Sequence, residues 1–177
     1  LTSDDVGHIV SCNYVANAGG ELRIYSWENV TANPKLLLSW VSDCPNNLGR
    51  KIYVKGDLNK LAYIYVTVSF NSTVLRWEVK NGEVTSSVPE KINFTNPNPT
   101  WTYLGKMVPI EVSKTSNYFI NCAPGDFHIT YMNGTNNTCL YNSPNIKWLG
   151  SAHAFDYVDL HGAKYLFLME TNPYNAC

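Results

Sequence analysis

Three polar side chains near the end of the chain have the types and spacing of metal ligands. His153, Asp159 and His161 are separated by even numbers of residues, so in a β-strand they share one face. Aspartate and histidine are both ligands of metals such as zinc. Asp159 also aligns with Asp57, which has no histidine beside it, so a role in shaping a turn competes with metal binding. We treat these three residues as weak metal candidates and expect no cofactor.

Enzymatic chemistry has less support in the sequence. A glycosidase needs two carboxylates about 5–9 Å apart, and the 14 Asp and Glu residues are scattered at spacings that select no pair. The chain has no Walker loop and no GxGxxG, GxSxG, HExxH or CxxC motif. We predict no catalytic residue, and a polysaccharide-acting hydrolase or lyase ranks third among the possible functions.

Aromatic rings beside asparagines offer a different chemistry, which is binding. Trp101 follows a polar stretch of Asn and Pro residues, and Trp148 lies in a second connection of this kind. Rings in exposed loops stack on sugars while amides bond hydroxyl groups, although the same rings also serve protein interfaces or fold back over a sheet. The predicted ligand-binding residues are Trp101, Tyr103, Trp148, Asn98, Asn145 and Asn46.

The overall composition narrows the partners and the compartment. Only 15% of the 177 residues are charged, and the formal net charge is −1, so the chain lacks the basic footprint of a nucleic-acid-binding protein. No apolar stretch approaches the roughly 20 residues that a membrane-spanning helix needs. Low charge and 21 asparagines are typical of extracytoplasmic proteins, so we expect secretion or attachment to an outer-membrane surface.

Strands must position these residues, because helical periodicity is nearly missing. Most segments alternate between apolar and polar residues or are rich in Val, Ile, Tyr, Phe and Trp, with turn residues such as Asn81-Gly82 between them. The predicted strands are 8–15, 22–28, 36–42, 51–56, 61–69, 73–79, one within 84–94, 108–113, 118–122, 126–132, 138–142, 152–158 and 164–170.

Two phrases recur at intervals near 50 residues. Asp57-Leu and Asp159-Leu both lead through a turn into a Tyr-rich strand, and Trp27 and Trp77 both precede Glu at the end of a strand phrase. We expect these two Trp side chains in the core of each unit and Trp40 packed as well. A period near 50 residues with about four strands is typical of propeller blades.

The predicted fold is therefore all-β, with antiparallel four-stranded repeat units in a β-propeller-like or partial propeller arrangement. A β-sandwich is the alternative. The approximate units are 1–50, 51–95, 96–150 and 151–177. The first unit lacks its first strand and the last stops before its third, so we expect a single all-β domain or a segment of a longer repeat array.

The two best-preserved repeat phrases carry a resemblance to a known group of proteins. The segments GELRIYSWENVTANPKLLLSW (20–40) and VKGDLNKLAYIYVTVSFNSTVLRWEVKNGEV (54–84) resemble the repeat units of uncharacterised surface lipoproteins from Bacteroides-type bacteria. The resemblance covers roughly 8–94, extends more weakly to 151–170 and does not include 96–150. It implies a propeller-like, extracytoplasmic protein that faces glycans, and it brings no catalytic signature.

Cysteines and glycosylation sequons add two further expectations. Five cysteines leave at least one unpaired within the chain. We expect Cys122 and Cys139 not to be joined, because a whole strand separates them, and Cys12 to be a core thiol on the face of Val10 and Tyr14. Five Asn-x-Ser/Thr sequons, at Asn29, Asn71, Asn93, Asn133 and Asn136, keep a eukaryotic or viral ectodomain as the second choice of source.

The sequence thus predicts an extracytoplasmic binding module that recognises an uncharged glycan through loop aromatics. The alternative is a protein-contact, adhesion or structural surface module whose partner is a cell-surface protein. An enzyme is less favoured than either. We expect no nucleic-acid partner and no membrane span in this chain.

Overall fold

A computed structural model describes ten segments of the chain, and within them the protein is all-β. The segments are 1–15, 20–42, 48–68, 73–93, 106–109, 116–123, 126–133, 136–143, 154–160 and 163–169. Side chains are described in 1–13, 20–42, 52–66 and 73–93. All strand pairs in these segments are antiparallel, and none of their residues forms a helix that is long and apolar enough to cross a membrane.

The first sheet has the strand order β1-β2-β3-β4. Its strands are β1 (Thr2–Ser3), β2 (Ile9–Val15), β3 (Glu21–Trp27) and β4 (Lys35–Val41). The expectation that this unit lacks its first strand was wrong, because β1 pairs with β2 through Thr2 and Ser3. Two residues are too few to show the alternation by which a strand is recognised in a sequence.

The second sheet has the order β5-β6-β7-β8, and β9 also pairs with β7. Its strands are β5 (Leu48–Asp57), β6 (Leu61–Val68), β7 (Thr73–Lys80), β8 (Glu83–Val84) and β9 (Glu90–Asn93). The predicted tight turn at Asn81-Gly82 is confirmed. Both residues have positive φ, 52° and 77°, as a two-residue hairpin turn with its primed geometry requires.

A third sheet, which has four strands, and a separate strand pair follow. The third sheet has the order β10-β11-β12-β13, formed by β10 (Lys106–Pro109), β11 (Ser116–Ala123), β12 (Asp126–Asn133) and β13 (Asn136–Ser143). The last pair is β14 (Ala154–Leu160) with β15 (Ala163–Met169). Chain connectivity and turn residues predicted these neighbours correctly, since within each sheet every strand after the first pairs with the one before it in the sequence, except β9, which pairs with β7.

The register of the third sheet bears on the two cysteines expected to stay apart. Cys122 on β11 lies opposite Phe127, and Cys139 on β13 lies opposite Thr130, with β12 between them. Two strand spacings and three residues of strand place their Cα atoms about 14 Å apart. A disulfide needs Cα atoms within about 7 Å. The strand order on which the expectation depended is therefore confirmed.

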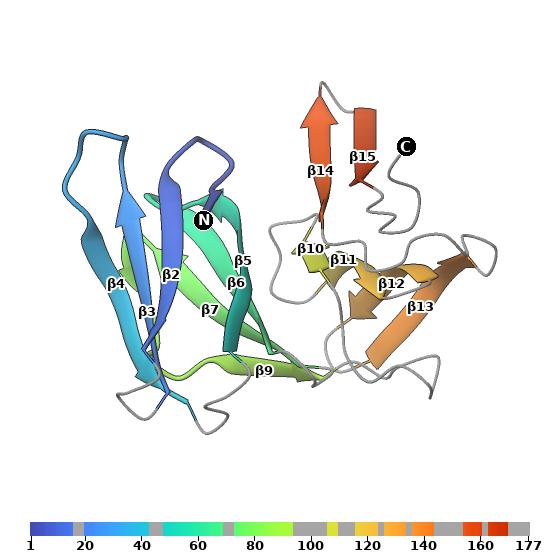
Figure 1. Ribbon diagram of the computed structural model, residues 1–177, viewed down its shortest axis with the longest axis horizontal. Coiled ribbons are helices and arrows are strands. Elements are labelled where there is room, and N and C mark those ends of the chain that lie inside the picture. Colours follow the sequence, from blue (N-terminus) through green and yellow to red (C-terminus); the bar gives the residue numbers. More distant parts are fainter. Residues whose placement is uncertain are drawn as a thin grey trace, which may run out of the picture.

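The second sheet lies between the first and the third (Figure 1), and β5 contacts both β2 and β10. Both of its faces are buried, which explains the run of apolar residues in β6. One face packs against the first sheet, and the other forms a smaller cluster around Tyr63, Tyr65 and Ile92. The sheets do not close into a ring within the described residues.

The core between the first two sheets corrects the prediction for Trp27 and confirms those for Trp77, Trp40 and Cys12. Trp77 is 2% exposed, and its ring meets that of Trp40 edge-on with centroids 5.7 Å apart. Cys12 packs partly buried against the same core. Trp27, however, is only half-buried and lies off the core face, which Leu22 and Ile24 occupy in β3.

The register explains the error over Trp27. It is the last residue of β3 and pairs with Ile9, whereas Trp77 pairs with Ile64 in the interior of β6. The position in the first sheet that corresponds to Trp77 is therefore closer to Ile24. The shared Trp-Glu phrase aligned two residues that lie at different depths in their strands.

Candidate functional site

A cleft of about 360 Å³ opens between the first and second sheets, and it falls in the size range of small-molecule sites. Its lining residues come from four connections and the strand ends beside them. They are His8, Ser26, Trp27, Glu28, Ala32, Asn33, Lys35, Leu37, Leu58, Asn59, Asn81 and Gly82. One aromatic residue, three asparagines and two charged side chains other than histidine thus surround one space.

Antiparallel topology brings these connections together. The β3–β4 loop covers 28–34, the β5–β6 turn covers 58–60, and the β7–β8 turn covers Asn81 and Gly82. Consecutive antiparallel strands place alternate connections at the same end of the sheets. Loops at the end of a rigid sheet are a common place for binding residues.

Asp57 shapes the β5–β6 turn, as its alignment with Asp159 predicted. Its Oδ1 accepts a hydrogen bond from the backbone N–H of Asn59 at 2.9 Å, and its carbonyl accepts one from the N–H of Lys60 at 2.9 Å. The β7–β8 turn is fixed to this one, because the N–H of Gly82 donates to the carbonyl of Leu58 at 2.8 Å. The floor of the cleft is therefore two turns bonded to each other.

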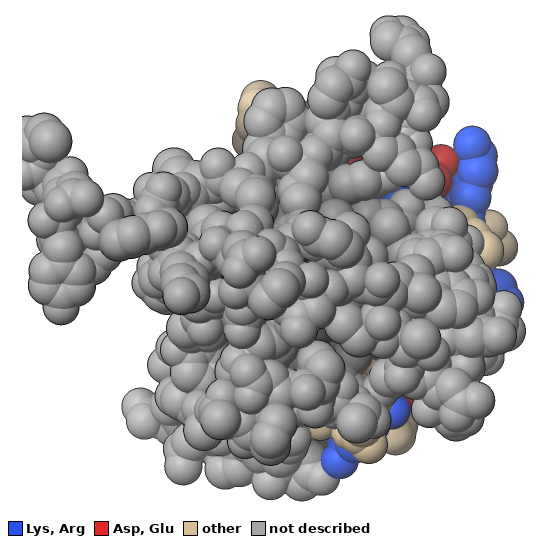
Figure 2. All heavy atoms as spheres, turned by 90° about the vertical axis from the view of Figure 1, so that its right-hand side faces the viewer, with Lys and Arg blue, Asp and Glu red and all other residues tan. Residues whose placement is uncertain are grey.

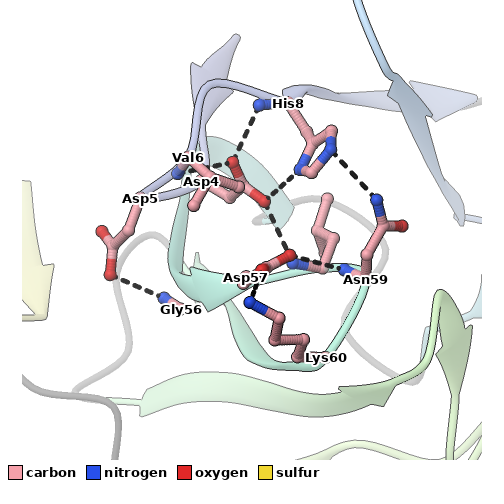
Figure 3. Close-up of polar contacts among 9 residues, drawn as sticks. Asp4, Asp5, Val6, His8, Gly56, Asp57, Asn59 and Lys60 are labelled. Carbon is pink, nitrogen blue, oxygen red and sulfur yellow. Dashed lines mark hydrogen bonds and ion pairs between the residues drawn. The ribbon is translucent and has the colours of Figure 1, made fainter.

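Asp4 joins the first sheet to the same turn (Figure 3). Its carboxylate is fully buried and accepts four hydrogen bonds. Oδ1 accepts from the backbone N–H of Val6 at 3.1 Å and of His8 at 2.8 Å. Oδ2 accepts from the backbone N–H of Leu58 at 3.0 Å and bonds the Nδ1 of His8 at 2.6 Å. Burial alone would raise the pKa of Asp4, but these hydrogen bonds outweigh it and the pKa is lowered.

We call this hydrogen-bonded link from Asp4 and His8 to Leu58 the tie between the two sheets. His8 forms the wall of the cleft next to it. Its Nδ1 faces the Asp4 carboxylate, and its Nε2 lies 3.2 Å from the Nδ2 of Asn59. Ligand atoms of Asp4, His8 and Asp57 lie within 4.8 Å of one another, a spacing that a metal ion can bridge. Each of these side chains already has a protein partner, including Lys60 at 3.3 Å from Asp57. We therefore assign the group a structural role.

The opposite wall of the cleft is closed by Lys35, at the start of β4. Its Nζ donates to the carbonyl of Gly82 at 2.8 Å and to Oε1 of Glu83 at 2.6 Å, so it links the first sheet to the β7–β8 turn. On the loop before it, the Oδ1 of Asn29 accepts from the N–H of Thr31 at 3.0 Å, which rigidifies that connection.

The residues that the sequence singled out as a site lie outside the described side chains. Trp101, Tyr103, Trp148, Asn98, Asn145, Asn46, His153 and His161 fall between the described segments, and Asp159 is described only as backbone in β14. The described residues instead bring together Trp27, Asn33, Asn59 and Asn81. The predicted combination of an aromatic ring with asparagine amides thus occurs in the described residues at positions that the sequence did not indicate.

Sequence reasoning missed the tie of Asp4 and His8 for a physical reason. Their partner Leu58 is 54 residues away from Asp4, and nothing in local periodicity connects the two segments. The only available signal was the Asp-x-x-x-His spacing, which in a loop has no fixed geometry.

Lysine side chains beside the cleft are paired with acidic groups, and the basic side chains of described residues on the face in Figure 2 are dispersed. On the face shown in Figure 2, the visible Lys and Arg side chains of described residues lie apart from one another along the rim. Lys35, Lys55 and Lys60, which lie beside the cleft and the Asp4 loop, each have an acidic partner. No basic patch is visible among the described residues of that face.

The fold and the cleft define an all-β protein of successive antiparallel sheets with a mixed aromatic and amide cleft between the first two. The chain belongs to the family described as Domain of unknown function (DUF8500), whose profile matches residues 1–176. No curated protein and no solved structure matches the chain.

Proposed function

We propose that this protein is an extracytoplasmic binding module that recognises an uncharged glycan, and that the cleft between the first two sheets is a binding site for it. The observation that carries the proposal is the cleft lining, in which Trp27 accompanies Asn33, Asn59 and Asn81. Aromatic surface and neutral amides match the apolar faces and hydroxyl groups of sugars.

Two features of the molecule support this proposal over a charged ligand. The net charge is −1, and Lys35 in the cleft is neutralised by Glu83 at 2.6 Å. A polyanion would gain little from such a surface. Secretion or attachment to an outer-membrane surface, a propeller-like arrangement of the sheets and kinship with surface lipoproteins are parts of the same proposal, and they rest on the composition and the repeat phrases.

The test is a glycan array followed by calorimetry with the oligosaccharide that binds best. Trp27→Ala should weaken binding about tenfold, as the loss of one aromatic contact does. Asn33→Ala should weaken it as well, whereas Asn13→Ala, an exposed asparagine of β2 outside the cleft, should bind like wild type. Failure of wild type to bind any sugar at millimolar concentration would refute the proposal.

The loop aromatics of the sequence prediction belong in the same experiment. Trp101→Ala and Trp148→Ala measure whether a second binding surface exists on the connections after β9 and β13. Loss of binding in these two variants, with normal binding by Trp27→Ala, would move the glycan site away from the cleft.

A protein-contact or adhesion module is the second candidate. The observation that favours it is the edge strand β4, on which Leu36 is 50% and Val41 63% exposed. Apolar side chains on an exposed edge are suited to pairing with another protein. Capture of a cell-surface protein that Leu36→Lys and Val41→Lys together abolish, with no sugar bound, would select this function.

A further inference from the structure

The floor of the cleft contains an open position above Gly82. A Cβ atom added to Gly82 would lie 3.8 Å from the Oδ1 of Asn59 and 3.8 Å from the Nζ of Lys35, with no other neighbour within 4 Å outside the adjoining residues. One side of this position offers a hydrogen-bond acceptor and the other a donor. Lys35 uses two of its three N–H groups, on Gly82 and Glu83, and keeps one for a ligand.

The direction of the Asn59 amide follows from its neighbours. The Asp4 carboxylate can only accept, so the Nδ1 of His8, 2.6 Å away, must carry a proton. In neutral imidazole the other nitrogen, Nε2, is then an acceptor. The Asn59 group 3.2 Å from Nε2 must be the donating NH₂, and Figure 3 shows the Asn59 oxygen pointing away from the imidazole.

We propose that Asn59 and Lys35 hold one hydroxyl group of the ligand above Gly82, and that the Asp4–His8 pair sets the specificity by turning the Asn59 oxygen toward that hydroxyl. The hydroxyl donates to Oδ1 of Asn59 and accepts from Nζ of Lys35. This inference rests on the proposed function, because it names the group of the glycan that the cleft reads. Asp4 and His8 act as positioning residues and do not touch the ligand.

The affinity for the ligand should therefore depend on pH. When His8 takes up a second proton, Nε2 becomes a donor, and the Asn59 amide must turn its oxygen toward the imidazole. The NH₂ group then faces the hydroxyl together with Lys35, so the hydroxyl oxygen accepts from two donors while its own O–H loses the acceptor that Asn59 had offered, which weakens binding. The charged groups on the elements around His8 are Asp4 and Asp5 on its own loop, Asp57 and Lys60 on the β5–β6 turn, and Glu28 and Lys35 across the cleft.

The first arm of the test needs no ligand. Protein labelled with ¹⁵N at histidine and asparagine is followed by NMR from pH 8 to pH 5, the range in which histidines change charge. At pH 8, His8 should show a protonated Nδ1 and a bare Nε2, and the Asn59 NH₂ signal should shift as His8 titrates. His8→Gln and Asn59→Ala assign the two signals. A protonated Nε2 at pH 8 would overturn the inference.

The second arm uses cellohexaose, xylohexaose and mannohexaose as probes in calorimetry at pH 7.5 and pH 5. Asn59→Ala and Lys35→Met should each weaken binding about tenfold, the value of one hydrogen bond. Wild type should lose affinity several-fold at pH 5, and Asn59→Ala should not. The matched control is Lys60→Met, which removes an exposed lysine next to the cleft that does not line it.

The outcomes separate this inference from the proposed function. Binding by wild type that Asn59→Ala and Lys35→Met leave unchanged would overturn the hydroxyl position while the glycan function stands. Absence of binding by any probe, with the expected His8 protonation in NMR, would refute glycan recognition and support the positioning of Asn59. The same loss of affinity at pH 5 in Asn59→Ala as in wild type would refute the coupling to His8.

Discussion

Replacement of Asp4 by alanine tests the tie between the first two sheets most directly. The substitution removes the acceptor of four hydrogen bonds, from the backbone of Val6, His8 and Leu58 and from the His8 ring. The hydrogen bond to Leu58 is buried, and a buried donor left without a partner costs about 1–3 kcal/mol. The two other backbone donors are closer to water and lose about 0.5–1 kcal/mol each. We expect the free energy of unfolding to fall by about 2–5 kcal/mol.

Asp5 is a matched control because it is the next residue and also bonds the second sheet. Its carboxylate is 40% exposed and meets Lys55 and the backbone N–H of Gly56, each at 2.9 Å. Water can replace these partners, so Asp5→Ala should cost about 1 kcal/mol. The difference between the losses in free energy of unfolding for Asp4→Ala and Asp5→Ala measures the effect of burial and not of charge, since each substitution removes one carboxylate.

Urea unfolding followed by tryptophan fluorescence gives the two free energies, and hydrogen exchange gives a local readout. In Asp4→Ala the amide proton of Leu58 should lose protection before the amides inside β6, because its acceptor is gone. If Asp4→Ala destabilises the protein no more than Asp5→Ala, or if the Leu58 amide stays protected, the assignment of Asp4 as the tie is wrong.

Three further perturbations follow from the described residues. Gly56→Ala should lower Tm by several degrees more than Gly7→Ala, although both glycines have a similar positive φ, 105° and 99°. The reason is that a Cβ at Gly56 would clash with a backbone oxygen, whereas one at Gly7 would meet nothing within 4 Å. Equal losses of Tm in calorimetry would contradict this. Trp77→Ala should cost about 3–5 kcal/mol in urea unfolding, and Trp40→Ala should cost less because part of Trp40 stays in water. Hydrogen bonds lower the pKa of Asp4 below 3.8, so its contribution to stability is complete above that pH and is lost as the pH falls through the lowered value. Acid unfolding of Asp4→Asn should lack this part of the pH dependence, and an unchanged profile would show that another carboxyl group is responsible.

Much of the fold was predictable because most strands have a recognisable pattern in their own residues. Alternating residues in β2 and β3 and the Asn81-Gly82 turn placed the hairpins, and the pairing of neighbours followed from short connections. β6 was recognisable from its apolar run, which it has because both faces of its sheet are buried. The two-residue β1 had no such signal, because its pairing depends on the Asp4 loop and not on its own residues.

The candidate site was harder to predict because its parts are local features that only the packing of two sheets joins. The sequence showed that Asp57 turns the chain between two strands, and that is what Asp57 does. It did not show that the same turn receives the Asp4 carboxylate or that Asn59 faces His8. Loop composition pointed to Trp101 and Trp148 through their polar neighbours, a criterion that says nothing of which connections meet.

The succession of antiparallel sheets along the chain explains why a cleft forms at this place. Each sheet presents its connections at its own end, and a space between adjacent sheets is left wherever the connections are too short to cover it. Here Leu58 closes the bottom of the gap as part of the core, while Lys35 reaches across it to Gly82. Glycine at position 82 satisfies the positive φ of the turn and also leaves the space beside Asn59 unfilled. One residue thus serves the hairpin and the cleft, so the folding requirement and the proposed binding position coincide in the sequence.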